Sequence, residues 1–130
     1  MKDRRVLIVD DDALLRKILE RTFAERGWQC AAASNAEVGW ELVHSIKPDL
    51  LVLDIFLPGK WSGLDMLRLL KVENQFPQMA VVMVTAGDPG KYAALSREAG
   101  ANILIPKPFS PKSFMVQVED LFSEKEAENE

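Results

Sequence analysis

Acidic, hydroxyl and amino side chains directly follow four short apolar runs of this sequence. They belong to Asp10, Asp11, Asp12, Asp54, Thr85 and Lys107. Neighbouring carboxylates repel one another and raise each other's pKa, so a cluster of them needs a neutralising cation. Oxygen ligands without histidine or cysteine favour Mg²⁺, Mn²⁺ or Ca²⁺. With a lysine and a hydroxyl nearby, the set would bind a phosphoryl group, and one carboxylate could accept it as an acyl phosphate.

These side chains would come together if the apolar runs were neighbouring strands of one parallel sheet. The runs are apolar throughout rather than alternating, which is typical of strands buried on both faces. We expect strands over 6–9, 28–33, 50–53, 80–84 and 103–105, with the weakly apolar second one at an edge. Ligands of open α/β sheets bind beyond the carboxyl ends of the strands, where all these polar residues would lie.

Helical periodicity fills each gap between the expected strands. Asp12 has the place of a helix N-cap, and Ser34 with Glu37 has the spacing of a capping box that would open the second helix. Asp88 and Pro89 predict another helix start. The helices are expected over about 15–23, 34–45, 63–73, 89–98 and 111–122. Five strand–helix units in alternation indicate an α/β fold with right-handed crossovers.

Composition narrows the classes of function. The 130 residues include 16 basic and 20 acidic ones, a net charge of −4, which disfavours direct nucleic acid binding. One cysteine excludes an internal disulfide framework. No apolar run has the length of a signal peptide core or a membrane span, so we expect a cytoplasmic protein. Residues 1–122 are expected to form one domain, and residues 123–130 an acidic, disordered tail.

The chain resembles the receiver domain of two-component response regulators over nearly its whole length. The matching segments are VLIVDDDALLR (6–16), PDLLVLDIFLPG (48–59), VVMVTAG (81–87) and PKPF (106–109). The resemblance implies a flavodoxin-like (βα)5 sandwich whose parallel strands have the order 2-1-3-4-5. It also implies that a histidine kinase or phosphotransfer protein donates a phosphoryl group to this chain.

By position, the resemblance identifies Asp54 as the phosphoacceptor and Mg²⁺, or Mn²⁺, as the cofactor. Asp11 would ligate the metal directly, and Asp10 would act mainly through a metal-bound water. The acceptor Asp54 itself and the backbone carbonyl of Phe56 would supply further ligands.

The resemblance assigns the phosphoryl pocket to three more residues. Thr85 would donate a hydrogen bond to a phosphoryl oxygen, Ala86 would leave room for the group, and Lys107 would pair with another oxygen. The Lys107–Pro108 bond is often cis in this family.

As a member of that family, the chain would be a signalling switch that catalyses only its own phosphorylation and dephosphorylation. Phosphorylation would bias the face formed by the fourth helix, fifth strand and fifth helix toward an unidentified protein target. We expect a monomer or a phosphorylation-dependent dimer, without membrane contact. The fourth helix has a thin apolar stripe, mainly Tyr92 and Leu95, which suits a loosely held switching element.

Two positions depart from the family pattern. Leu104 stands where an aromatic residue is common, so it is either a better-packed core residue or a change in how the switch works. Gly63 follows Asp54 by nine residues instead of the usual eight, so the loop that carries Trp61 is one residue longer. The indole would either pack against the third or fourth helix or act as a lid or partner contact.

Two other functions fit parts of the pattern. Asp10 and Asp12 form an Asp-x-Asp like that of haloacid-dehalogenase-like phosphatases, in which Asp10 would be the nucleophile and Thr85 and Lys107 would match later motifs. That interpretation gives Asp54 no role, and the sequence lacks the acidic pair that follows later in those phosphatases. Alternatively, the chain is an interaction module that has kept the fold but no longer transfers phosphate.

Overall fold

Five apolar runs form one parallel sheet in the computed structural model, which describes residues 3–128. The strands are β1 (Arg5–Val9), β2 (Gln29–Ala33), β3 (Leu50–Asp54), β4 (Ala80–Thr85) and β5 (Ile103–Pro106). Their spatial order is β2-β1-β3-β4-β5, so the expected order and the edge position of β2 are confirmed. Because neighbouring strands are parallel, their carboxyl ends lie along the same edge.

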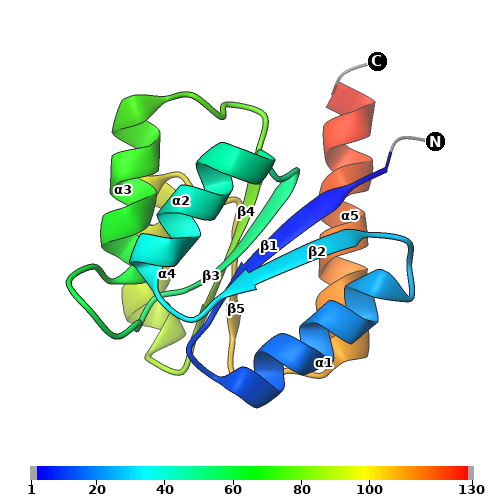
Figure 1. The fold of residues 1–130 in the computed structure, drawn as a ribbon, viewed down its shortest axis with the longest axis horizontal. Helices are drawn as coiled ribbons and strands as arrows, with labels where there is room; N and C mark the ends of the chain where they lie inside the picture. The colour runs from blue at the N-terminus through cyan, green and yellow to red at the C-terminus, as the bar shows by residue number, and fades with distance from the viewer. Residues whose placement is uncertain (1–2, 129–130) are drawn as a thin grey trace.

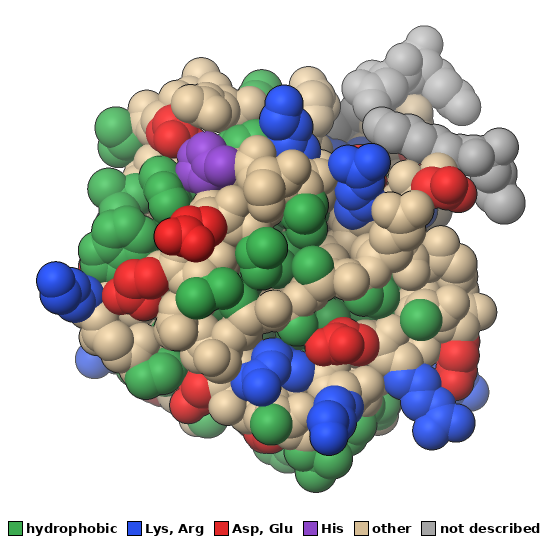
Figure 2. All heavy atoms as spheres, viewed as in Figure 1, with side chains coloured by type: hydrophobic (Ala, Val, Ile, Leu, Met, Phe, Trp, Pro, Cys, Tyr) green, Lys and Arg blue, Asp and Glu red, His purple; other side chains and the backbone are tan. Residues whose placement is uncertain are grey.

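The helices form a layer on each face of this sheet (Figure 1). One layer contains α1 (Ala13–Ala24) and α5 (Pro111–Glu128), and the other contains α2 (Ala36–Ile46), α3 (Gly63–Glu73) and α4 (Pro89–Ala99). Side chains of β1 alternate between two cores: Leu7 packs with the α2, α3 and α4 layer, and Ile8 packs with the α1 and α5 layer. This explains why the strands have no polar face. On the face shown in Figure 2, basic side chains lie among acidic ones.

The first and fourth helices begin as predicted, and the second does not. Asp12 accepts hydrogen bonds from two N–H groups of the first turn of α1, and Asp88 accepts one from Gly90 in α4. The capping box predicted at Ser34 is wrong: Asn35 is the N-cap of α2, and its side chain accepts from Val38 N. Asn35 is extended at φ −149° and ψ 167°, so the helix starts one residue later.

The expected disordered tail also differs from the structure. Helix α5 continues to Glu128, so residues 123–128 are helical. Glu126 forms an ion pair with Arg4, whose guanidinium lies 4.6 Å from the centre of the Phe122 ring. These contacts give the last turns tertiary partners that an amphipathic pattern does not reveal. Residues 129 and 130 lie outside the described chain. Within residues 3–128, no helix is both long and apolar enough to cross a membrane.

His44 connects the last turn of α2 to the end of α3. Its Nδ1 lies 2.7 Å from the carbonyl oxygen of Trp40, and its Nε2 lies 2.7 and 2.8 Å from the two carboxylate oxygens of Glu73. Both partners are acceptors, so both ring nitrogens donate only when the imidazole is protonated. The hydrogen bond to Trp40 raises the pKa of His44, burial lowers it, and Glu73 raises it further, with a net increase above 6.5.

The His44–Glu73 pair should make stability depend on pH. Because the folded-state pKa is raised, its contribution is complete below pH 6.5 and is lost as pH rises through the folded value. We expect His44→Gln to cost about 1 kcal/mol of unfolding free energy near pH 6 and less near pH 8.5, since the pair is partly solvated. Urea titrations of wild type and His44→Gln at both pH values measure this difference. A cost that is equal at both values would show that the charge contributes nothing.

Candidate functional site

The predicted polar residues meet at the carboxyl edge of the sheet. Asp10 directly follows β1, Asp54 ends β3, Thr85 ends β4 and Lys107 follows β5. Asp10, Asp54 and Thr85 are almost fully buried, at 1%, 3% and 0% exposure. Buried carboxylates are rare unless they are paired or bind a cation, so this edge is chemically unusual.

Three of the carboxylates form one cluster. Asp10, Asp11 and Asp54 each offer an oxygen within 4.8 Å of the others, and Asp11 is the exposed member. Asp12 lies outside this group because its carboxylate caps α1. The acidic run therefore divides into a cap and a cluster, as the sequence predicted.

Lys107 is the cation that faces the cluster. Its Nζ donates a hydrogen bond to Asp54 Oδ2 at 3.1 Å and lies 2.9 Å from Asp10 Oδ2. Burial lowers the pKa of Lys107, but the interactions with Asp10 and Asp54 outweigh burial and raise it. The ammonium group is thus charged, and it offsets one of three carboxylates. The Lys107–Pro108 peptide is cis, as the resemblance implied.

The surroundings of Asp54 make its ionised form less favourable and raise the pKa of its carboxyl. Burial raises the pKa of its carboxyl, and the charge of Asp10 raises it further, to about 6. The charge and hydrogen bond of Lys107 and the Phe56 N–H act in the opposite direction. The Phe56 N–H donates to Asp54 Oδ1 at 3.2 Å. At neutral pH the carboxylate is therefore ionised, although its ionised form is destabilised.

The donor set fits a hard divalent cation. Asp10 Oδ1 accepts from Asp12 N, but the buried Oδ2 makes no hydrogen bond within the described part of the chain, although Lys107 lies close. The single Lys107 ammonium is shared between Asp10 and Asp54, so the three clustered carboxylates keep an excess of negative charge that favours an additional positive group. Three clustered carboxylates without histidine or cysteine suit Mg²⁺ or Mn²⁺.

Thr85 and Ala86 stand beside the acidic cluster at the end of β4. Thr85 Oγ1 accepts a hydrogen bond from Gly87 N at 2.9 Å, whereas Ala86 is exposed. The role of these two residues toward a phosphoryl group stays a prediction, as does the role of the Phe56 carbonyl toward a metal.

The loop after Asp54 turns sharply and returns to the strand end at Gly63. Gly63 N donates to Ile55 O at 2.8 Å, and a Cβ on Gly63 would lie 1.9 Å from the backbone oxygen of Asp54. Only glycine fits at position 63, which explains why a glycine is kept at the end of this loop although the loop is one residue longer. The indole of Trp61 packs edge-on against Trp40, with ring centres 5.7 Å apart. Trp61 also packs against the core that lies beneath α2, α3 and α4, which supports the packing interpretation of this residue.

Leu104 is partly buried on β5 and packs with the core beneath α2, α3 and α4. The structure supports a packing role for this residue. On α5, Met115 is buried, whereas Val116 is half exposed.

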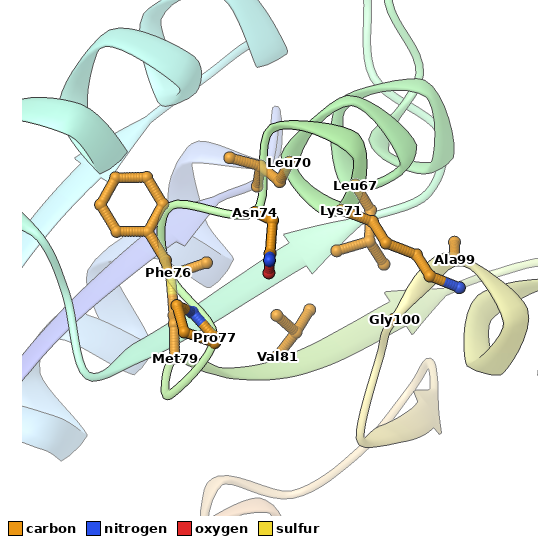
Figure 3. A pocket seen from close by; sticks show the side chains of 10 residues that line it. All are labelled: Leu67, Leu70, Lys71, Asn74, Phe76, Pro77, Met79, Val81, Ala99 and Gly100. Carbon is orange, nitrogen blue, oxygen red and sulfur yellow. The ribbon is translucent and has the colours of Figure 1, made fainter.

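A separate cavity of about 150 Å³ lies near the beginning of β4, between the end of α3 and Gly100 (Figure 3). Leu67, Leu70, Phe76 and Met79 line much of it. None of the residues of the acidic cluster contributes to its walls. This cavity is therefore separate from the acidic cluster at the carboxyl edge of the sheet.

Comparison with known proteins agrees with this geometry. Residues 6–119 match the family described as response regulator receiver domain. The DNA-binding response regulator MtrA of Mycobacterium tuberculosis is 35% identical over 115 residues, which cover 88% of this chain and 49% of MtrA. The chain thus spans about half the length of the curated relatives it matches.

Solved structures show the same architecture. A CheY-like response regulator receiver domain protein from Methanospirillum hungatei superimposes with a TM-score of 0.88 at 28% identity, covering 98% of this chain and 99% of that one. The N-terminal domain of an uncharacterized protein from Wolinella succinogenes gives 0.83 at 30% identity, with 96% and 98% covered. With its strand order and the family match over residues 6–119, this chain belongs to the response regulator receiver domains, the signalling switches of two-component systems.

Proposed function

We propose that this receiver domain accepts a phosphoryl group on Asp54 from a phosphohistidine of a sensor kinase or a phosphotransfer protein. The observation that carries the proposal is the buried Asp54 carboxylate, which faces Lys107 and two further carboxylates at the carboxyl edge of the sheet. A carboxylate that remains ionised at neutral pH despite burial is a suitable nucleophile.

The transfer exchanges one bond to phosphorus for another. A carboxylate oxygen of Asp54 forms the new O–P bond while the P–N bond to the donor imidazole breaks, and the electron pair of that bond remains on the imidazole nitrogen. Lys107 already contacts Asp54 Oδ2 and would pair with an oxygen of the incoming group. Thr85 would donate a hydrogen bond to another oxygen, and Ala86 would leave space beside it.

Asp10, Asp11 and Asp54, with the carbonyl of Phe56, would hold Mg²⁺ or Mn²⁺. When bound, the cation neutralises the anionic oxygens that face one another during transfer. The chain's contribution is to hold these carboxylates within 4.8 Å of each other, partly out of water, where charge interactions are strong.

The proposed output is a change in the face formed by α4, β5 and α5. Thr85 ends β4, and Gly87 N links its hydroxyl to the loop before α4. The Phe56 ring also contacts Tyr92 of α4, edge-on with 5.3 Å between ring centres. These contacts connect the phosphoacceptor loop to α4, so a new charge at Asp54 would bias that helix.

In this proposal the chain acts as a switch that catalyses only its own phosphorylation and dephosphorylation, and its target is another protein. A monomer or a phosphorylation-dependent dimer, and a cytoplasmic location, stay predictions. The absence of direct nucleic acid contacts by this segment also stays a prediction, because MtrA is described as DNA-binding and is about twice as long.

Replacing the phosphoacceptor should abolish phosphorylation. We expect Asp54→Asn to take up no radiolabel from acetyl phosphate with Mg²⁺, whereas wild type forms an acid-stable, base-labile acyl phosphate. Asp10→Asn is the matched variant, since Asp10 is the nucleophile that the phosphatase alternative requires. Labelling that persists in Asp54→Asn and disappears in Asp10→Asn, mapped by peptide analysis, would favour that alternative.

Failure to bind beryllofluoride with Mg²⁺ would favour an interaction module without phosphate transfer. Wild type should bind this phosphate mimic, and Asp54→Asn should not.

The charges around Asp54 also allow the pKa of Asp54 to be predicted for the metal-free protein and for two variants. Its carboxyl pKa, followed by ¹³C NMR, should be about 6. Asp10→Asn removes a charge that raises this pKa, so the value should fall, and Lys107→Met removes a charge that lowers it, so the value should rise. Shifts in the opposite directions would contradict the electrostatic description of the site.

A further inference from the structure

Glu37 contacts the loop after the phosphoacceptor instead of capping its own helix. The carboxylate Oε1 accepts a hydrogen bond from the backbone N–H of Lys60 at 3.0 Å. The capping role that the sequence predicted for Glu37 is absent, because Asn35 provides the N-cap of α2. Glu37 is thus an acidic side chain committed to a segment 23 residues away.

The contact reaches the tip of the loop. Gly59 has φ +99°, a conformation that glycine adopts without strain. A Cβ added to Gly59 would lie 3.1 and 3.2 Å from the two carboxylate oxygens of Glu37. The carboxylate therefore lies directly against the turn at Gly59 and Lys60. Both residues belong to the loop between β3 and α3, which is one residue longer than usual.

The two ends of the loop have other attachments. At the start, Ile55 N donates to Val84 O at 3.0 Å, and at the end Ser62 and Asp65 form a capping box that begins α3. Between them, the attachments of the loop to α2 are the Glu37 hydrogen bond and the packing of Trp61 against Trp40. Helix α2 therefore fixes the middle of the segment that contains the Phe56 carbonyl.

We propose that Glu37 is a positioning residue that holds the longer β3–α3 loop in the shape needed for divalent cation binding beside Asp54. This inference rests on the proposed function, because it concerns how the same site binds its cation. Glu37 acts through the Lys60 N–H and contributes no ligand. Residues that orient ligands from outside the coordination shell commonly change metal affinity by about tenfold or more when they are removed.

The experiment compares Glu37→Ala with Glu37→Gln. The glutamine amide oxygen can still accept from Lys60 N, but it carries no charge. We expect the Mg²⁺ dissociation constant, measured by calorimetry, to increase about tenfold in Glu37→Ala and to stay within about twofold of wild type in Glu37→Gln. In the metal-free protein, the Lys60 amide proton resonance should move upfield only in Glu37→Ala.

Two matched controls separate this effect from general changes in charge. Glu41→Ala removes an exposed carboxylate one turn further along α2, and Lys60→Ala removes the lysine charge but keeps the backbone N–H. Both should bind Mg²⁺ like wild type. Thermal unfolding and circular dichroism of each variant confirm that it is folded, and Glu37→Gln keeps the comparison meaningful if Glu37→Ala is less stable.

Each outcome decides between explanations. Wild-type affinity in Glu37→Ala would overturn the inference while leaving the proposed function intact. Equal weakening in Glu37→Gln and Glu37→Ala would also overturn it, because the charge rather than the hydrogen bond would then set the affinity. Failure of wild type to bind Mg²⁺ would overturn the proposed function, and the inference with it.

Discussion

Three carboxylates share the carboxyl edge of the sheet with one lysine, and this unequal charge governs the site. Lys107 contacts Asp54 and Asp10 through a single ammonium group, so it cannot neutralise both together with Asp11. Burial and the nearby charge of Asp10 raise the pKa of Asp54 to about 6. The fold holds these groups in place although they repel, and a divalent cation would relieve that repulsion.

The surrounding structure makes this repulsion sustainable. The strands before Asp10 and Asp54 are buried on both faces, so the backbone that carries the two carboxylates is held by two cores at once. Gly63 closes the loop so tightly that a single added carbon would collide with the backbone of Asp54. Stability supplied by apolar packing elsewhere thus offsets the unfavourable approach of the acids.

The sequence allowed the sheet and the meeting of Asp10, Asp54 and Lys107 at its carboxyl edge to be predicted, because both depend on local patterns. Strand-length apolar runs ending in polar residues are visible without knowledge of tertiary contacts. The errors arose where a tertiary partner decides the outcome: Glu37 fits a capping box by spacing, yet it binds Lys60. Likewise, the acidic residues after Phe122 are typical of a frayed end, but the ion pair between Arg4 and Glu126 is formed across the fold.

The residue at position 104 affects how a change at Asp54 could reach α4. Leu104 provides no aromatic ring on β5, and the Thr85 hydroxyl accepts a hydrogen bond from Gly87 N. A Cβ on Gly87 would lie 2.9 Å from the Phe56 ring and 3.0 Å from the Tyr92 ring, so both rings already lie against this backbone. A displacement of Thr85 toward a phosphoryl group would therefore move Gly87 and disturb the contact between Phe56 and Tyr92. The proposed switch would thus involve the contact between Phe56 and Tyr92 of α4, without an aromatic residue on β5.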